Sequence, residues 1–231
     1  MGNIHLIGGE KGGVGKSLVS RLLAQYFIDN SIPFVGFDTD RSHGALLRFY
    51  EGYASPVLID SYESLDAIVE AAADNPERRV LIDLAAQTQA PLTQWMDESQ
   101  LIDVASEMDL RIRYWHVMDS GRDSVDLLQR LFDTYQGRLN YVIVKNEIRG
   151  NDFEILRKAG LLDRAQELNA QVVSIKKLAE SAMTKIDAHS SSFWAATQTD
   201  RKDAIGLGIL ERQRVRMWLN GAYQELRKVD P

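Results

Sequence analysis

Short apolar segments alternate with longer amphipathic segments along most of the chain. Runs rich in Val, Ile and aromatic residues predict buried strands at residues 4–8, 33–38, 80–84, 110–118, 140–145 and 171–175. Residues 57–60 form either a short edge strand or a loop. Apolar residues at helical spacing predict helices at residues 17–30, 64–73, 124–135, 152–159, 161–168 and 207–229. This alternation predicts an α/β fold, a mostly parallel twisted sheet with helices on both faces.

Composition adds few constraints. No linker rich in Pro, Gly or Ser divides the 231 residues, so we expect one domain over residues 1–231, with the C-terminal helix packed on it. The chain has no cysteine, which excludes disulfides, zinc–thiolate sites and iron–sulfur clusters. Because no apolar run is long enough to span a membrane and no secretory signal is present, we expect a cytoplasmic protein.

The most informative segment lies between the first predicted strand and the first predicted helix. It reads Gly8-Gly9-Glu10-Lys11-Gly12-Gly13-Val14-Gly15-Lys16-Ser17. Glycines let backbone N–H groups converge on phosphate oxygens, and the positive end of the helix dipole lies at the same point. Lys16 is then placed to neutralise the β- and γ-phosphates, and the Ser17 hydroxyl to coordinate Mg²⁺. Glu10 stands where the strict pattern has a glycine, and Lys11 is a second lysine within the loop.

The run from Lys11 to Ser17 resembles the deviant Walker A motif of the ParA/MinD group of P-loop ATPases. That group includes partition ATPases, cell-division-site ATPases and conjugation-associated relatives of the TraL type. The resemblance is clear over residues 1–90 and weak beyond them. It implies an ATP-dependent homodimer, in which Lys11 of one subunit reaches the phosphates held by the other. The residues expected to contact ATP in this loop are Glu10, Lys11, Gly12, Gly13, Val14, Gly15, Lys16, Ser17 and Leu18.

Two predicted strands end in carboxylates. The first is followed by Asp38-Thr39-Asp40 and the second ends at Asp83. Ligands of parallel sheets lie beyond the carboxyl ends of the strands, so these side chains are expected near the phosphate loop. Asp38 and Asp83 would hold Mg²⁺ together with Ser17, and Asp40 would orient the attacking water or accept its proton. A solvated turn is the alternative for Asp38 and Asp40.

Two further positions take their roles from the resemblance. Relatives carry a Gly or a Pro pair soon after the second carboxylate, whereas this chain has Leu84-Ala85-Ala86-Gln87-Thr88. Gln87 is either a water-positioning residue or an ordinary residue at a helix entry. Asn146 follows a predicted strand at the place where an asparagine of the relatives reads the adenine base, and an ordinary turn residue is its alternative.

The sequence gives weaker signals for surfaces that would bind a partner. The net charge of −6 argues against general polyanion binding, but Arg212, Arg214 and Arg216 give the C-terminal helix a basic character suited to non-specific DNA. A solvated helix face explains them equally well. No membrane anchor is evident in the tail. Phe193 and Trp194 belong either to the core or to an exposed loop that docks a partner.

We therefore expect a switch ATPase that hydrolyses ATP to ADP and phosphate with Mg²⁺, with Lys11, Lys16 and Asp40 as its catalytic residues. Hydrolysis would be slow alone and stimulated by a partner protein, and the cargo would be DNA in plasmid or chromosome partition or in conjugation. The alternative is a metabolic P-loop enzyme, such as a dethiobiotin-synthetase-like ligase or a small-molecule kinase. Such an enzyme would not need Lys11.

Overall fold

A parallel β-sheet forms the centre of the molecule. The computed structural model describes residues 2–40, 44–198 and 205–231. In this part of the chain seven strands lie in the order β3-β2-β4-β1-β5-β6-β7, and all neighbours are parallel. The strands are β1 (Gly2–Gly8), β2 (Phe34–Asp38), β3 (Ala54–Pro56), β4 (Arg79–Asp83), β5 (Leu110–Met118), β6 (Asn140–Asn146) and β7 (Gln171–Ile175). The predicted α/β fold class is thereby confirmed.

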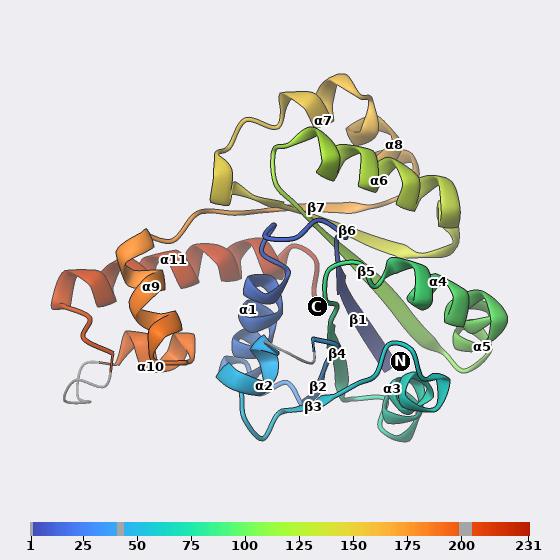
Figure 1. Ribbon diagram of the computed structural model, residues 1–231, viewed down its shortest axis with the longest axis horizontal. Helices are drawn as coiled ribbons and strands as arrows, with labels where there is room; N and C mark the ends of the chain where they lie inside the picture. The colour runs from blue at the N-terminus through green and yellow to red at the C-terminus, as the bar shows by residue number, and fades with distance from the viewer. Residues whose placement is uncertain (1, 41–43, 199–204) are drawn as a thin grey trace.

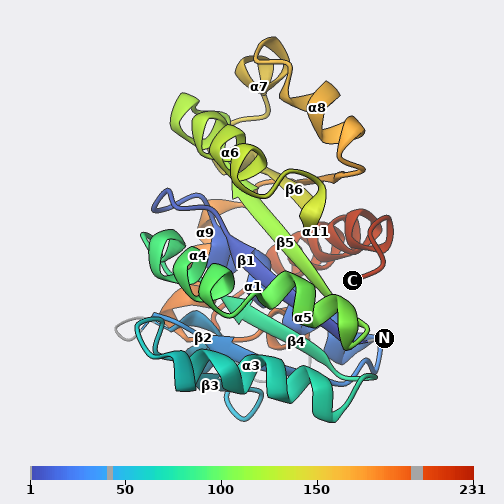
Figure 2. The ribbon, with the colours of Figure 1, turned by 90° about the vertical axis from the view of Figure 1, so that its right-hand side faces the viewer.

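Helices cover both faces of this sheet (Figure 1). One face carries α1 (Lys16–Asp29), α2 (Ala45–Phe49), α9 (Glu180–Ala188), α10 (Phe193–Thr197) and α11 (Ile209–Arg227). The other carries α3 (Tyr62–Asp74), α4 (Gln89–Glu98), α5 (Leu101–Glu107), α6 (Arg122–Tyr135), α7 (Glu154–Lys158) and α8 (Leu161–Glu167). Figure 2 looks onto the face with α3, α4 and α5. Two 3₁₀ turns, Gln136–Arg138 and Glu147–Arg149, flank β6.

The central strands are mostly apolar because each of their faces meets a layer of helices. In β1, Ile4 and Leu6 belong to the core on the α3 side, whereas Ile7 belongs to the core on the α1 side. His5 is fully buried and its ring lies 5.7 Å from that of Phe27 in α1. This two-sided burial explains why the strands read as continuous apolar runs rather than as alternating ones.

The long elements follow the sequence pattern, and the differences concern short ones. The sequence did not predict α2, α4, α5, α9 and α10, whereas the equally short α7 and α8 were predicted at residues 152–159 and 161–168. Helix α3 begins earlier than predicted, since Ser61 rather than Ser64 is its N-cap and accepts a hydrogen bond from the backbone N–H of Ser64. The edge strand lies at Ala54–Pro56, just before residues 57–60.

Candidate nucleotide-binding site

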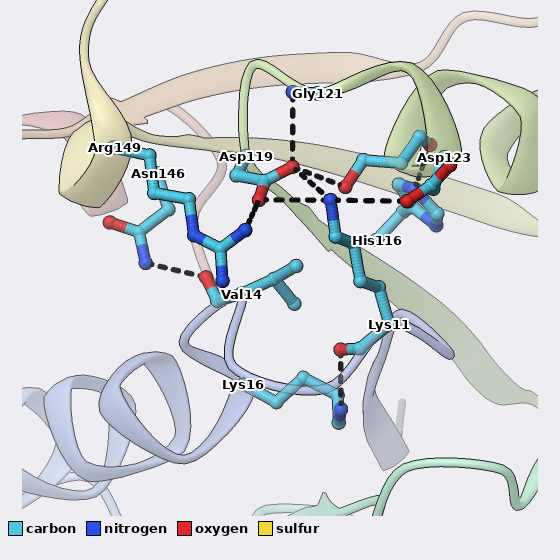
Figure 3. Close-up of polar contacts among 10 residues, drawn as sticks. Lys11, Val14, Lys16, His116, Asp119, Gly121, Asp123, Asn146 and Arg149 are labelled. Atoms are coloured by element: carbon cyan, nitrogen blue, oxygen red, sulfur yellow. Dashed lines mark hydrogen bonds and ion pairs between the residues drawn. The ribbon is translucent and has the colours of Figure 1, made fainter.

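The segment after β1 forms a tight loop that leads into α1. Gly15 is the N-cap of α1 and has a φ of 97°, a left-handed conformation that favours glycine. A Cβ atom at Gly15 would lie 2.1 Å from Nδ2 of Asn146. That amide nitrogen donates a hydrogen bond of 2.7 Å to the carbonyl oxygen of Val14 (Figure 3). Asn146, at the end of β6, therefore holds the loop from the side.

Lys16 turns back into this loop. Its side chain is buried, and its ammonium donates a hydrogen bond of 3.3 Å to the carbonyl oxygen of Lys11. Burial lowers the pKa of Lys16, while the carboxylates of Asp83, Asp40 and Glu10 oppose this shift. The loop thus holds a cation that is largely removed from solvent. Such a charge is stabilised by an anion that replaces the lost hydration.

Two buried carboxylates meet at the ends of adjacent strands. Asp38 and Asp83 are direct register partners across β2 and β4, and they are 1% and 3% exposed. Asp38 accepts backbone hydrogen bonds from Asp40 at 3.0 Å and from Leu46 at 2.9 Å. Oδ1 of Asp83 is buried without a hydrogen-bond partner. Burial and the charge of Asp38 raise the pKa of Asp83 to about 7, against the opposing hydrogen bond from the Ser17 hydroxyl.

These residues fit a magnesium ion. Ser17, Asp38 and Asp83 offer one hydroxyl and two carboxylates, and hard divalent cations prefer such oxygen ligands. The unpartnered Oδ1 of Asp83 is a buried acceptor that lacks only a cation. The described residues contain no group of three or more His, Cys, Asp and Glu side chains that could hold a metal without help. Mg²⁺ is commonly held in this incomplete way, with phosphate oxygens supplying the remaining ligands.

Thr39 connects the loops that follow β2 and β4, a role that sequence reasoning did not assign. Its buried hydroxyl donates to the carbonyl oxygen of Asp83 at 3.1 Å and accepts the backbone N–H of Ala85 at 2.8 Å. Gln87, further along the same loop, is exposed and has a φ of 64°. It adopts a left-handed conformation there, which is more usual for glycine. It precedes α4 by two residues and is not part of that helix.

The ammonium of Lys11 contacts two acidic residues of its own chain (Figure 3). Its ammonium is 3.2 Å from Oδ2 of Asp119 and 3.5 Å from Oδ2 of Asp123. Arg149 contacts the same oxygen of Asp119 at 3.2 Å. Asp119 is buried, yet the hydrogen bond from the Ser124 hydroxyl and the other donors around it keep its pKa below the usual value. Asp119 directly follows β5. It could therefore have been predicted as Asp38 and Asp83 were, from the presence of a carboxylate at the end of a predicted strand.

The remaining predicted residues surround this centre. Gly12 and Gly13 are exposed at the tip of the loop, and Asp40 is partly buried at the last described position before residue 44. Oδ1 of Asn146 is buried without a partner. Asn146 also lines a cavity of about 250 Å³, together with Leu18, Ile148, Lys177, Leu178, Glu180 and Met183. Whether Asn146 reads a base stays a prediction.

One expectation about the basic helix requires correction. Arg212 is only 8% exposed and donates hydrogen bonds to the carbonyl oxygens of Leu207 and Gln198. It therefore packs inside the molecule and is not available to a DNA phosphate. Arg214 and Arg216 are exposed, although one guanidinium nitrogen of Arg216 donates to the carbonyl oxygen of Thr197. None of the helices in the described ranges is long and apolar enough to cross a membrane.

Comparisons with known proteins find relatives along the whole chain. No family model matches the chain. Protein MobD of Acidithiobacillus ferrooxidans is 25% identical over 231 residues, covering 98% of this chain and 97% of MobD. Protein TraL of Escherichia coli is 25% identical over 245 residues, covering 98% of both proteins. The sequence similarity therefore spans almost the whole length of these relatives.

Solved structures give the fold. The cell division protein MinD of Aquifex aeolicus superimposes with a TM-score of 0.55 at 14% identity, over 94% of this chain and 97% of MinD. A Borrelia burgdorferi protein described as a plasmid partition protein, bound to AMPPNP, gives 0.52 at 12% identity, over 95% and 99% of the chains. The fold is therefore the one seen in this MinD and in this plasmid partition protein. Within this MinD-like fold, the loop after β1, the carboxylates after β2 and β4 and the cavity beside β6 share one edge of the sheet.

Proposed function

We propose that this chain is a Mg²⁺-dependent switch ATPase of the ParA/MinD type, which dimerises around ATP and hydrolyses it to ADP and phosphate. One observation carries the proposal. The buried ammonium of Lys16 lies in a glycine-rich loop next to two buried carboxylates, Asp38 and Asp83, one of which has an oxygen without a partner. A triphosphate with its metal ion supplies the anion that the lysine lacks and the cation that the carboxylates lack.

The roles of the residues follow from their positions. Lys16 and the backbone N–H groups of the loop bind the β- and γ-phosphates, and Ser17, Asp38 and Asp83 hold Mg²⁺. When bound, Mg²⁺ neutralises charge that develops on the phosphates. Asp40 orients the attacking water or accepts its proton. Thr39 ties the loop of Asp40 to the loop after β4, so that both loops respond to the same phosphate.

The cavity of about 250 Å³ receives the base. Its apolar walls include Leu18 and Leu178, which suit the faces of a purine. The amide nitrogen of Asn146 is bound to Val14, so its Oδ1 is the atom left for the ligand. A carbonyl oxygen accepts a hydrogen bond from the amino group of adenine, and guanine has a carbonyl at the same ring position. This geometry favours ATP over GTP.

Dimerisation requires Lys11 to change partners. In the single protomer its ammonium is neutralised by Asp119 and Asp123. The contact with Asp123, whose side chain is 78% exposed, contributes little stability. Asp119 keeps Arg149, the Ser124 hydroxyl and a backbone N–H as donors when Lys11 leaves. The lysine can therefore move to the phosphates of a partner subunit without leaving a bare buried charge behind.

The cargo and the stimulating protein belong to the same proposal. Relatives named MobD and TraL support a role in conjugative DNA handling, and a neighbour described as a plasmid partition protein supports DNA segregation. Arg214 and Arg216 remain as surface cations for non-specific DNA, and a dimer doubles each contact. A partner protein accelerates ATP hydrolysis, and the dimer then dissociates and releases the DNA.

The decisive experiment is light scattering after size exclusion, with and without Mg²⁺-ATP. We expect Asp40→Ala to accumulate an ATP-bound dimer, because this variant does not hydrolyse ATP and its dimer therefore does not dissociate. Lys11→Ala should bind a fluorescent ATP analogue and stay monomeric. Lys158→Ala, which removes a lysine that is 71% exposed on α7, should behave as the wild type. A wild-type protein that does not bind ATP overturns the proposal, and a Lys11→Ala protein that dimerises normally refutes the role of this lysine in trans.

Retention of random duplex DNA on filters separates the cargo-positioning switch from a metabolic enzyme. We expect ATP-dependent retention that falls steeply as salt rises, and a further loss in the double variant Arg214→Ala, Arg216→Ala. Retention that is the same without ATP, or none at all, contradicts the DNA part of the proposal.

A further inference from the structure

A cavity of about 220 Å³ borders the glycine-rich loop and lies between α4 and α6. Figure 2 shows the loop after β1 between these two helices. We call it the α4–α6 cavity, and the side chains in its walls include Glu10, Tyr114, His116, Leu127, Arg130 and Leu131. It shares no lining residue with the cavity of about 250 Å³ that we assign to the base. A nucleotide bound as proposed therefore does not account for it.

One wall of this cavity carries a buried acceptor without a partner. His116 in β5 is 3% exposed, and its Nε2 lies 3.2 Å from the carbonyl oxygen of Ser124. Because a carbonyl oxygen can only accept, Nε2 carries the proton, and burial keeps the ring neutral by lowering the pKa of His116 to about 4. Nδ1 makes no hydrogen bond to any residue that the structure describes. Since this ring lines the cavity, Nδ1 is the place for a donor from a ligand.

Hydrogen bonds hold the neighbouring wall in place. The Tyr114 hydroxyl is packed against the end of β1, where a Cβ atom at Gly8 would lie 2.1 Å from its oxygen. It donates to the side-chain oxygen of Gln89 at 2.8 Å, and the Gln89 amide nitrogen donates to the Thr93 hydroxyl at 3.2 Å. These bonds join β5 to α4 in the protein without a ligand. A wall that is already ordered loses less entropy at binding.

Two opposite charges border the cavity without pairing. The carboxylate of Glu10 and the guanidinium of Arg130 both line it, and neither forms a hydrogen bond or an ion pair within the part of the chain that the structure describes. The acidic residues one turn away on α6, Asp126 and Asp133, already pair with other arginines. A ligand that carries both charges can therefore satisfy Glu10 and Arg130 together.

We propose that the α4–α6 cavity binds a small zwitterion of the amino-acid class, with its ammonium towards Glu10 and His116 and its carboxylate on Arg130. The ammonium supplies the donor that Nδ1 of His116 lacks. Leu127 and Leu131 are one turn apart on α6 and form an apolar wall for an aliphatic side chain. The volume of about 220 Å³ is below that of a drug-sized pocket and suits one molecule of this size.

The cavity adjoins the proposed phosphate site through Glu10. The negative charge of Glu10 acts on Lys16, so the same charge repels the phosphates of a nucleotide held by that lysine. An ammonium bound to Glu10 offsets this repulsion. We therefore expect ATP to bind about two- to threefold more tightly when the zwitterion is present. This coupling rests on the proposed function, whereas binding of the zwitterion itself does not.

The test titrates three compounds into the nucleotide-free protein and follows the backbone N–H resonance of Gly9 by NMR. L-Leucine carries both charges, leucinamide lacks the carboxylate, and 4-methylpentanoate lacks the ammonium. We expect leucine to bind with a Kd on the order of 1 mM and each analogue to bind at least ~10-fold more weakly. The three compounds share one aliphatic side chain, so the differences report the charges alone.

Two variants assign the two ends of the ligand. Arg130→Gln should weaken leucine binding about fivefold and leave leucinamide binding unchanged, because leucinamide has no carboxylate to lose a partner. Glu10→Gln should weaken leucine binding about fivefold and leave 4-methylpentanoate binding unchanged, because that compound has no ammonium. Arg122→Gln is the matched control, since it removes from the same helix a guanidinium that is 75% exposed and lies outside the cavity lining.

Three results would overturn the proposal. Leucine that binds no more tightly than its analogues would show that the two charges are not recognised. Equal losses in Arg130→Gln and Arg122→Gln would show a general effect of charge on α6. No shift of Gly9 with any compound up to ~50 mM would show that the cavity takes no such ligand. A protein that binds leucine and fails to bind ATP would refute the proposed function and support this site.

Discussion

Gly15 and Asn146 show how single atoms shape the glycine-rich loop between β1 and α1. Gly15 has a positive φ, and the space that its missing Cβ leaves is filled by the Asn146 amide. That amide in turn binds the carbonyl oxygen of Val14. Glycine at this position therefore serves two needs, a left-handed backbone and close approach by another strand's side chain. Flexibility of the loop is not the reason for its presence.

Replacing Gly15 by alanine should consequently damage the empty protein as well as the bound one. We expect Gly15→Ala to lower the free energy of unfolding by about 2 to 4 kcal/mol, through backbone strain and displacement of Asn146. Urea unfolding without nucleotide measures this. Gly12→Ala is the matched control, because nothing lies within 4 Å of its ideal Cβ and its φ is outside the left-handed region. Its stability should change by no more than about 0.5 kcal/mol.

At the scale of elements, hydrogen bonds connect the ends of β2 and β4. Asp38 and Asp83 lie in register, and the Thr39 hydroxyl bridges the two loops through a carbonyl oxygen and a backbone N–H. Asp38 also fixes the start of α2 through Leu46. A ligand that moves one strand end therefore acts on both loops and on α2.

Thr39→Val tests this connection, because it keeps the shape of the side chain and removes the hydroxyl. The backbone N–H of Ala85 then loses its acceptor, so we expect a loss of stability of about 1 to 2 kcal/mol. If the chain hydrolyses ATP as proposed, kcat should fall by about tenfold while ATP affinity changes less, since only the concerted movement is impaired. Thr39→Ser retains the hydroxyl and should stay close to the wild type in both measurements. A Thr39→Val protein with unchanged kcat would show that the loops act independently.

For the whole molecule, two buried histidines couple stability to pH. Burial, helped by the charges of Arg113 and Arg79, keeps the pKa of His5 well below its usual value. Burial lowers the pKa of His116 to about 4. Both are therefore neutral in the folded protein where the unfolded chain is protonated. Below pH 6.5 the unfolded state binds more protons, so stability is complete above that pH and is lost as the pH falls.

We expect the free energy of unfolding to fall by about 2 kcal/mol between pH 6.5 and pH 5 on account of His116, and to fall further on account of His5. In His5→Gln the total pH-dependent loss should be smaller than in the wild type, whatever the stability at neutral pH. His189→Gln, which changes an exposed ring, should leave the slope as it is in the wild type. Urea unfolding at a series of pH values provides the slopes. Equal slopes in His5→Gln and the wild type would contradict the neutral state of this side chain.

The sequence by itself determined the parallel sheet, the glycine-rich loop after β1 and the two carboxylates that end β2 and β4. Strands such as β5 and β7 were predicted with their observed bounds, because continuous apolar runs between polar segments are a local property. The convergence of Lys16, Asp38 and Asp83 was also predictable, since the carboxyl ends of parallel strands lie at one edge. Some short helices, such as α2 and α10, were not predicted, although α7 and α8 of similar length were.

Only the tertiary structure decided which side chains meet. Lys11 is bound to Asp119, 108 residues away, and Arg212 is buried against the carbonyl oxygen of Gln198 instead of facing solvent. Phe193 is fully buried while its neighbour Trp194 is exposed. Such contacts depend on which strands lie side by side in the sheet and on how the helices pack against it, and residues close together in the chain encode neither. The local pattern therefore predicts where charged and aromatic groups occur, and the packing decides which of them remain open to a partner.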